Sequence, residues 1–280
     1  MTHVLCVGNA TLDIVNLLES YPDEDSEIRA LSQSVRMGGN AANTARVLAH
    51  LGNEVQWLGN LSDQPQAAII ELALQRCGVS YEHAKYLPGS LPTSYISLSQ
   101  RNGSRSIVHH RDLAEYAAED FAGLNLYGFD WVHFEGRAVD QLKVMMLRAR
   151  NMCGLPLSLE VEKARPGIET LFGLADVLFF SHDYARTKGF FDAETFLLDL
   201  PVDTIASCTW GDGGAWVRDE SGEVHHAIAF EPVRIVDTIG AGDVFNAAMV
   251  HGLTSGQGVV EALQAAVILA GEHCGHEGFV

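Results

Sequence analysis

The most informative stretch of the chain is Val236-Asp237-Thr238-Ile239-Gly240-Ala241-Gly242-Asp243-Val244-Phe245-Asn246-Ala247-Ala248, in which small residues lead directly into an apolar helix. A Gly-Ala-Gly turn at a helix start leaves the first backbone N–H groups, those of Ala241, Gly242 and Asp243, without intrahelical acceptors. Together with the positive end of the helix dipole, these groups predict a site for an oxyanion such as a phosphoryl group.

Asp243 is the unusual member of this turn. A carboxylate at a helix start ordinarily caps the helix and stabilises it. A phosphate site, in contrast, gains nothing from added negative charge unless the carboxylate serves the incoming nucleophile. The sequence leaves both interpretations of Asp243 open.

On the N-terminal side of this turn, short apolar runs alternate with helical patterns. The clearest helix begins at Ser62-Asp63, which are candidate N-caps, and stops at Gly78. Apolar strands separated by helices are typical of a largely parallel sheet covered on both faces, so we expect an α/β fold. The predicted strands are His3–Gly8, Glu54–Gly59, Asp130–Glu135, Pro156–Val161, Asp176–Phe180 and Thr204–Thr209.

Two stretches, approximately residues 12–37 and 93–111, alternate apolar and polar residues instead. Each contains a turn signal, Tyr21-Pro22-Asp23-Glu24-Asp25 in the first and Asn102-Gly103 in the second. Each stretch alone is equally consistent with an ordinary surface hairpin. Because a single two-stranded ribbon is marginally stable, we expect the two inserts to pair into one small sheet that covers something.

Several groups of polar residues lie where a ligand could bind. Gly38-Gly39-Asn40-Ala41-Ala42-Asn43 opens a helix, in which Asn40 can cap and Asn43 faces the same way one turn later. Paired amides suit vicinal hydroxyls, although a capped helix packed through its alanines explains this motif better when it is taken alone. Asp13 follows the first strand, where open α/β sheets bind ligands, or it is a surface turn residue.

Glu160 and Glu162 share one face of an apolar strand through the period-two alternation. They either lie near a hydrated metal ion, which would offset their repulsion, or emerge at an exposed strand end. Trp210-Gly211-Asp212-Gly213-Gly214 follows the last predicted strand. Its glycines either admit a nucleotide or provide positive φ angles for a hairpin.

Composition and charge exclude several classes of protein. The 280 residues include 18 Lys and Arg against 36 Asp and Glu, a net charge of −18 that argues against nucleic-acid or anionic-membrane partners. We read no signal peptide or spanning helix. The five cysteines are odd in number and far apart, which favours reduced thiols in the cytoplasm over disulfides or a zinc site. The P-loop GxxxxGK[ST], the dinucleotide GxGxxG and the hydrolase GxSxG and HExxH patterns are missing from the sequence.

Taken together, the Gly38-Gly39-Asn40 and Asp237–Asp243 motifs resemble the two signatures of the ribokinase-like (PfkB-type) sugar kinases. The acidic stretch Tyr21–Gln33 is similar to the branch of that family that phosphorylates ketohexoses. Glu135-Gly136-Arg137, Glu160-Val161-Glu162-Lys163 and Cys274-Gly275 extend the similarity in register over essentially the whole chain.

The resemblance implies a single kinase domain over residues 1–280, a three-layer α/β sandwich whose two inserts form a β-sheet lid and pair with the lid of a second subunit. It implies ATP-dependent phosphorylation of a ketohexose, with fructose giving fructose 1-phosphate, and Mg²⁺ as cofactor. A K⁺ ion near the Asp237–Gly242 loop is a further option. The alternatives are a kinase for another sugar or a nucleoside, or a sugar sensor without catalysis.

The resemblance also assigns roles to individual residues. At the reacting groups it implies Asp243 as catalytic base, the Gly240, Ala241 and Gly242 backbone as anion hole, and Arg105 near the transferred phosphoryl group. Around the substrates it implies Asp13, Gly39, Asn40 and Asn43 at the sugar hydroxyls, and Thr238, Gly211, Asp212, Gly214 and Cys274 at ATP. The chain departs from its family at Ser181-His182-Asp183-Tyr184, where related kinases carry an Asn-x-x-Glu element associated with magnesium. The metal-proximal residues are therefore unassigned, with Glu160 and Glu162, acting through water, as substitutes.

Overall fold

The main sheet of the protein crosses the centre of the molecule. The computed structural model describes residues 1–101, 104–201 and 203–279, and in them eight strands form this sheet in the order β14-β13-β12-β11-β10-β9-β1-β4. The six strands from β12 to β4 are parallel, and β13 and β14 extend the sheet antiparallel at one edge. The strands are β1 (His3–Val7), β4 (Glu54–Leu58), β9 (Trp131–Glu135), β10 (Leu157–Val161), β11 (Val177–Ser181), β12 (Ile205–Thr209), β13 (Ala215–Arg218) and β14 (Val224–Ala227).

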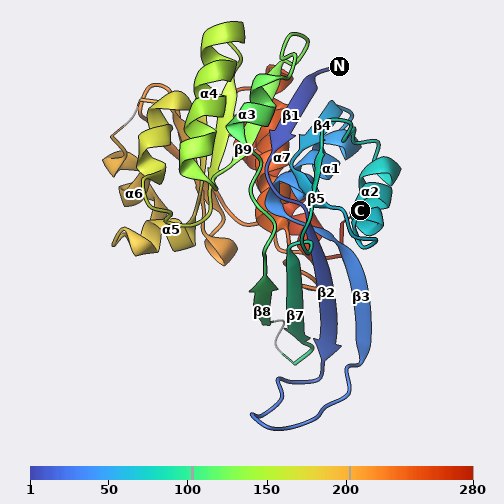
Figure 1. Ribbon diagram of the computed structural model, residues 1–280. Helices are drawn as coiled ribbons and strands as arrows, with labels where there is room; N and C mark the ends of the chain where they lie inside the picture. Colours follow the sequence, from blue (N-terminus) through green and yellow to red (C-terminus); the bar gives the residue numbers. More distant parts are fainter. Residues whose placement is uncertain (102–103, 202, 280) are drawn as a thin grey trace.

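Helices cover both faces of this sheet, as Figure 1 shows. In β1, Val4 and Cys6 join one buried apolar layer, whereas Leu5 and Val7 join the other. One layer contains α1 (Asn40–His50), α2 (Ala67–Arg76), α7 (Ala241–Thr254) and α8 (Val259–Cys274). The other contains α3 (Ala118–Ala122), α4 (Val139–Cys153), the short η1 (Ile168–Leu174), α5 (His182–Thr187) and α6 (Ala193–Asp199). All six predicted strands and the expected three-layer α/β fold are therefore confirmed.

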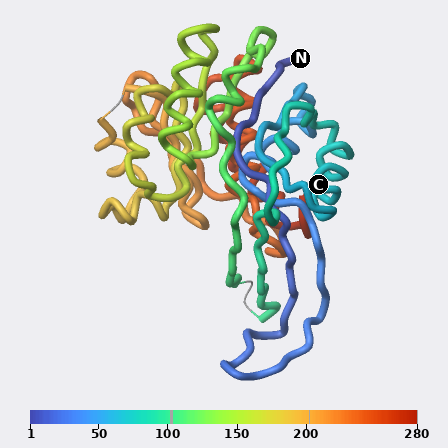
Figure 2. Tube along the Cα trace, viewed as in Figure 1, coloured from blue at the N-terminus to red at the C-terminus, as the bar shows by residue number. Residues whose placement is uncertain are grey.

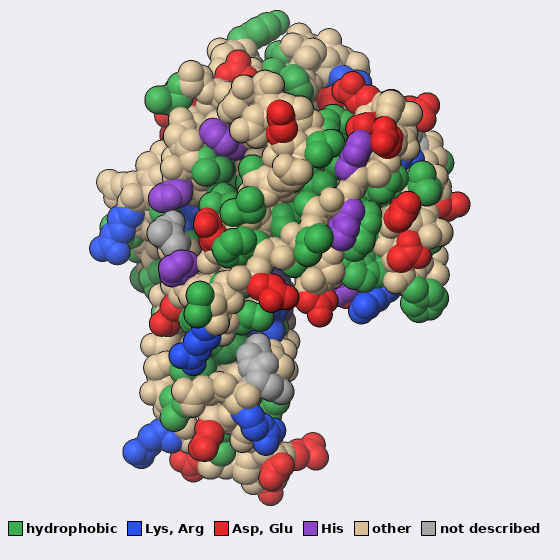
Figure 3. Space-filling view, turned by 180° about the vertical axis from the view of Figure 1, so that it is seen from behind, with side chains coloured by type: hydrophobic (Ala, Val, Ile, Leu, Met, Phe, Trp, Pro, Cys, Tyr) green, Lys and Arg blue, Asp and Glu red, His purple; other side chains and the backbone are tan. Residues whose placement is uncertain are grey.

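A second sheet stands apart from the sandwich. Its order is β3-β2-β7-β8, built from β2 (Thr11–Leu18), β3 (Ser32–Gly38), β7 (Thr93–Ser99) and β8 (Arg105–His110). Each insert forms an antiparallel ribbon, and the two ribbons join through the parallel pair β2 and β7. The sheet extends below the body in Figures 1 and 2, and from behind it forms a narrow projection (Figure 3). The expected pairing of the inserts into one sheet is confirmed.

Three local predictions are not confirmed. The first ribbon closes through a long loop, residues 19–31, rather than a tight turn at Tyr21–Asp25, and Asn102-Gly103 lies outside the described residues. The helix expected from Ser62 begins instead at Ala67. Ser62 ends strand β5 (Asn60–Ser62), which pairs with β6 (Lys85–Leu87), and its hydroxyl accepts the N–H of Gln64 in a turn before the helix.

The state of the cysteines and the character of the helices were also predicted from the sequence. All five cysteines lie in the described part of the chain and are free thiols. Among the described residues, no helix combines the length and the apolar character needed to span a bilayer. The assignment of residues 1–280 to one domain stays a prediction.

Candidate functional site

Asp243 lies at the start of α7, which follows the Gly-Ala-Gly turn. The residue preceding the helix is Gly240, whose φ of 84° places it in the left-handed region that favours glycine. Asp243 is only 6% exposed, and its side chain does not cap the helix. Instead, its Oδ2 accepts a hydrogen bond of 2.8 Å from Asn43 Nδ2. The capping interpretation of Asp243 is therefore wrong, because the carboxylate accepts a hydrogen bond from Asn43 of α1 and none from the backbone of its own helix.

The backbone of this turn retains free donors. Ala241 N–H makes a long hydrogen bond of 3.4 Å to the carbonyl of Thr238, so the expectation that it is free is only partly met. The N–H groups of Gly242 and Asp243 have no acceptor within the described part of the chain. Two unbonded donors at the positive end of a fourteen-residue helix make this turn a candidate anion site.

Helix α1 supplies two amides from one of its sides. Asn40 Nδ2 donates to Glu160 Oε1 at 2.9 Å and to Glu162 Oε2 at 3.4 Å, while Asn43 holds Asp243. The helix is preceded by Gly39, at φ 97°, and Asn40 does not cap it, which corrects the expected cap. A side chain on Gly39 would place its Cβ 2.5 Å from the carbonyl oxygen of Asn9. Glycine thus lets α1 begin directly against the end of β1, with both amides turned toward carboxylates.

Asp13 belongs to strand β2 and is 6% exposed, so it is not a surface turn residue. Its Oδ1 accepts a hydrogen bond of 2.8 Å from the hydroxyl of Thr11. On the neighbouring strand, a Cβ at Gly38 would lie 2.0 Å from Asp13 Oδ2. Gly38 is therefore needed to seat this carboxylate at the base of the second sheet.

Two further carboxylates are buried at the ends of neighbouring strands. Burial, reinforced by repulsion from Asp243, raises the pKa of Glu160 well above its usual range, and its Oε2 has no hydrogen-bond partner. Burial also raises the pKa of Glu135, although Arg137 opposes the shift. Glu162 is more open, with 44% of its side chain exposed, so only it fits the interpretation of an exposed strand end.

The same physics acts on Asp243. Burial raises its pKa well above that of an ordinary aspartate, and repulsion from Glu162, Glu135 and Asp13 raises the pKa further. The hydrogen bond from Asn43 acts in the opposite direction and lowers the pKa. Five acids thus influence one another around the two asparagines. A hollow lined by residues of this group and three cations, Arg137, Lys163 and Arg165, opens beside them. Buried like charges are costly without a cation or protons, so this arrangement favours binding of positive charge.

Glu135 was not predicted from its own position, although a signal existed. It ends the predicted strand Asp130–Glu135, just as Glu160 lies near the end of Pro156–Val161. Glu135 Oε2 accepts the backbone N–H of Asn9 at 2.8 Å and that of Ala41 at 3.4 Å. It therefore joins the end of β1 to the start of α1.

The second sheet reaches the anion site through two arginines. Arg105 donates from NH1 to the Thr238 hydroxyl at 2.5 Å. Arg36, which sequence reasoning did not single out, forms an ion pair of 2.7 Å with Asp237, whose side chain is 3% exposed. The structure therefore brings Arg105 and Thr238 together, one from each side of the site.

The expected nucleotide residues form a second group. Gly211 and Gly214 have φ angles of 61° and 90°, so the positive-φ interpretation of this turn is confirmed. A Cβ at Gly214 would lie 2.1 Å from the carbonyl oxygen of Ala227, which fixes the hairpin to its return strand. Asp212 is exposed in the same turn. None of the described contacts joins this turn to Asp243.

Cys274 connects to the anion-site loop. Its carbonyl oxygen accepts the N–H of Val236 at 2.8 Å, immediately before Asp237. Burial raises the pKa of the Cys274 thiol, and the charge of Asp237 adds to this. At the position of the missing Asn-x-x-Glu element, Ser181 caps α5 by accepting the N–H of Tyr184 at 3.0 Å. That segment supplies a helix cap in place of a magnesium-associated acid.

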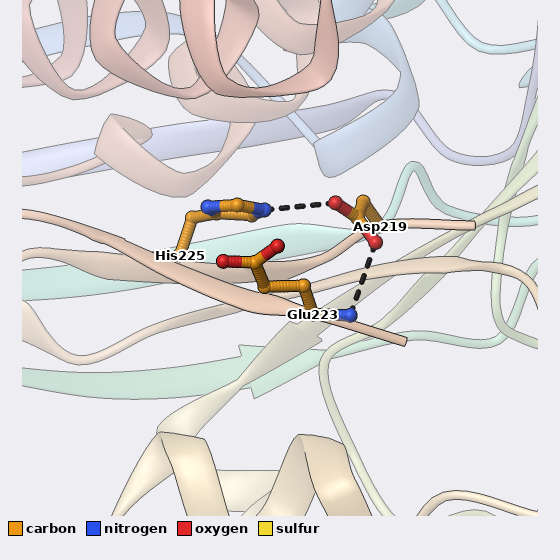
Figure 4. Close-up of side chains that lie close together, drawn as sticks. All are labelled: Asp219, Glu223 and His225. Carbon is orange, nitrogen blue, oxygen red and sulfur yellow. Dashed lines mark hydrogen bonds and ion pairs between the residues drawn. The ribbon is translucent and has the colours of Figure 1, made fainter. Parts of the chain in front are cut away.

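A separate cluster of Asp219, Glu223 and His225 lies in the β13–β14 hairpin (Figure 4). Asp219 Oδ1 accepts from the backbone N–H and hydroxyl of Ser221 and from Glu223 N–H, and Oδ2 pairs with His225 at 2.8 Å. The hydrogen bonds from Ser221 and His225 lower the pKa of Asp219. These contacts close the turn, at the opposite end of the hairpin from Gly214.

Comparisons with known proteins place the chain among the sugar kinases. The model of the pfkB family of carbohydrate kinases matches residues 1–279. Ketohexokinase from Mus musculus is 35% identical over 289 residues, covering 99% of this chain and 97% of the mouse protein. Two ribokinase structures share the fold over 99% of this chain. The one from Giardia lamblia has a TM-score of 0.85 at 16% identity over 96% of its length, and the one from Cryptococcus neoformans, in complex with ADP, has a TM-score of 0.81 at 20% identity over 95%.

Proposed function

The chain belongs to the pfkB family of carbohydrate kinases, and we propose that it transfers the terminal phosphoryl group of ATP to a ketohexose, converting fructose to fructose 1-phosphate. The observation that carries the proposal is the buried Asp243 carboxylate, which lies at the lip of an amide-lined anion site and is held by Asn43. The full-length similarity to mouse ketohexokinase supports a ketohexose as the acceptor.

Asp243 acts as the catalytic base late in the reaction. An ordinary aspartate has a pKa of about 3.9 and water, standing for a primary alcohol, about 15.7, so forming a free alkoxide first would cost roughly 16 kcal/mol. The raised pKa of Asp243 narrows that gap, because a more basic carboxylate accepts a proton more readily. Asp243 therefore orients the hydroxyl and takes its proton as the loose phosphoryl transition state bonds to the oxygen.

The Gly240–Gly242 turn stabilises charge on the transferred group. The unbonded backbone N–H groups of Gly242 and Asp243 are available to donate to phosphoryl oxygens as these gather charge. A helix end contributes only about 0.3–2 kcal/mol through its charge, so a cationic side chain is needed as well. Arg105, already bonded to Thr238 at the edge of this turn, supplies it.

The sugar binds between α1 and the base of the second sheet. Asp13 accepts a hydrogen bond from a sugar hydroxyl, and the amides of Asn40 and Asn43 both donate and accept, which suits vicinal hydroxyls. Asn43 Oδ1 is buried without a partner, so it is free to accept from a bound hydroxyl. Gly39 supports this surface by allowing α1 to begin against the end of β1, where a Cβ would lie 2.5 Å from the carbonyl oxygen of Asn9.

The carboxylates beside the sugar site fit Mg²⁺. Glu160 has a buried oxygen without a partner, and the partly open Glu162 shares Asn40 with it. Hard divalent cations take oxygen ligands and usually keep several waters, so these two acids would hold the ion through water. Bound Mg²⁺ supplies positive charge to the phosphate oxygens of ATP. Thr238, Cys274 and the Gly211–Gly214 turn with Asp212 border the nucleotide.

The second sheet closes over the sugar as a lid, and two lids pair in a homodimer. Arg36 and Arg105 already tie both ribbons to the loop before α7. On the face away from these arginines, Ile14, Val35, Tyr95 and Val108 form one row across the four strands in register. Val35, Tyr95 and Val108 are 48%, 50% and 68% exposed, and a second lid would cover them. The free cysteines support a cytoplasmic location.

The test of this function is ADP release, coupled to a reporter, across fructose, other ketoses, ribose and adenosine. We expect the highest kcat/KM with fructose and a product phosphorylated at the 1-hydroxyl, identified by phosphorus–carbon coupling in NMR spectra. Faster turnover of ribose or adenosine would reassign the acceptor. Sugar binding without ADP release would make the protein a sensor.

A further inference from the structure

Asp237 has both carboxylate oxygens engaged. Oδ1 accepts the N–H of Ile239 at 2.9 Å, and Oδ2 accepts from Arg36 at 2.7 Å and from the N–H of Gly278 at 3.4 Å. Its side chain is 3% exposed and that of Arg36 is 18% exposed. The loop before α7 therefore has its acidic group neutralised by a guanidinium that the second sheet delivers.

Three further oxygens at this loop are also engaged. The carbonyl of Ile239 accepts His273 Nε2 at 2.8 Å, and the hydroxyl of Thr238 accepts from Arg105 at 2.5 Å. The carbonyl of Cys274 accepts the N–H groups of Val236 and Asp237 at 2.8 and 3.3 Å. A monovalent cation is bound by several oxygens at once, and within the described residues these oxygens face nitrogen donors instead. The loop does not fit the K⁺ ion that the family resemblance implied.

We propose that the Arg36 guanidinium takes the place of a monovalent cation at the Asp237–Gly242 loop, so that phosphoryl transfer by this kinase does not depend on K⁺. The inference rests on the proposed function. A cation at this loop has one structural task, to balance Asp237 and hold the turn that presents the Gly242 and Asp243 N–H groups. Arg36 performs that task with a permanent charge and a planar fork suited to a carboxylate.

The position of Arg36 adds a consequence for the lid. Arg36 lies on β3, in register with Asp13 on β2, so one sheet row carries both a proposed sugar ligand and the charge that balances the loop. Removing one partner of a buried ion pair is strongly destabilising, because the remaining charge stays buried and unpaired. The anion site is thereby complete only while the base of β3 lies against the loop.

The first test is turnover of the wild-type protein at constant ionic strength in potassium chloride and in tetramethylammonium chloride, whose cation is too large for such a loop. We expect the two rates to agree within about twofold. A tenfold or greater activation by K⁺ would overturn the inference. Failure to turn over any sugar in either salt would count against the proposed function. Melting temperatures would still test the role of Arg36 in that case, because they do not depend on catalysis.

The second test compares melting temperatures of the wild type, Arg36→Gln and Arg76→Gln in the same two salts. Arg76→Gln is the matched control, because it removes one positive charge at an exposed position in α2. Only Arg36→Gln, whose Asp237 is left unpaired, should melt higher in K⁺ than in tetramethylammonium, and its kcat in tetramethylammonium should fall about tenfold and recover in K⁺. Equal melting of Arg36→Gln in both salts, or a K⁺-specific rise in the wild type, would overturn the inference.

Discussion

Asn43 Nδ2 donates a hydrogen bond of 2.8 Å to Asp243 Oδ2, joining the first turn of α1 to the first turn of α7 across 200 positions of sequence. Each helix begins after a glycine with a positive φ angle, Gly39 at 97° and Gly240 at 84°, and the two helices pack against each other. The proposed sugar amides and the proposed base are thus held in one place by the same contact. This relationship makes the first turns of α1 and α7 one functional unit.

Glu160→Gln should stabilise the unliganded protein at neutral pH. The folded pKa of Glu160 is raised, so the folded state binds more protons than the unfolded state above about pH 4, and stability falls as pH rises through the raised pKa. Each extra proton contributes a slope of about 1.4 kcal/mol per pH unit. Denaturant unfolding between pH 4 and 8 should show a flatter decline for this variant.

Glu54→Gln, at an exposed position at the start of β4, serves as control and should keep the wild-type decline. If Glu160→Gln declined as steeply as the wild type, the buried carboxylate would not be the source of the repulsion. Lower activity of Glu160→Gln with a raised Mg²⁺ requirement is expected from its proposed role.

Phe279→Ala should disturb the anion site from a distance. The ring of Phe279 packs against Gly240, where a Cβ would approach it within 2.1 Å, and it contacts His273 and Arg46. Loss of the ring lets the turn move, and small displacements of positioned groups are costly in rate, so kcat should fall by about tenfold with KM for fructose little changed. Steady-state kinetics test this, with Phe191→Ala, 84% exposed, as control. Equal kinetics for both variants would show that the ring does not hold the turn.

Sugar binding should protect the lid. If the second sheet closes over bound fructose, backbone amides of β7 and β8 exchange more slowly at saturating sugar. Hydrogen-exchange mass spectrometry reads this directly, and peptides of α4 on the far helical layer are the internal reference. Unchanged exchange in β7 and β8 would mean that the sheet does not respond to the sugar.

Val108→Glu should separate the proposed dimer. Val108 is the most exposed member of the apolar row on the outer face of the lid, so a charge there opposes pairing of two lids. Light scattering after size exclusion should give a dimer mass for the wild type and a monomer mass for Val108→Glu. Val144→Glu, 54% exposed on α4, should remain dimeric. A monomeric wild type would remove the proposal.

Much of the fold is local in origin and could be predicted. The six parallel strands are apolar on both faces, and the inserts alternate with period two, so their residue types alone indicated the sheets. The predicted start of α2 was wrong because Ser62 does not cap the helix, although serine is a favoured capping residue. Ser62 is the last residue of a strand that pairs with Lys85–Leu87 further along the chain. Likewise, strands β13 and β14 at one side of the sheet are only four residues long, and β14 carries two histidines, which weakens their pattern.

The site was predictable in its residues but not in its contacts. Asp243, Asn40 and Asn43 were singled out by glycine turns, whereas their partners depend on folding. No local pattern marks Arg36 as part of the site, because its role depends on an ion pair with Asp237, which lies 201 positions away in the sequence. Asn40 and Asp243 are residue types that often cap helices, but here both side chains make hydrogen bonds to other elements of the fold instead.

The central claim, that Asp243 accepts the proton of the sugar hydroxyl, is tested most directly by fructose-dependent ADP release from wild type and Asp243→Asn at saturating ATP. The amide matches the carboxylate in shape and still bonds Asn43 through its oxygen, so the variant should melt at or above the wild-type temperature. We predict a loss of about 10²-fold or more in kcat with KM for fructose little changed. A folded Asp243→Asn variant that turns over near the wild-type rate would contradict the account.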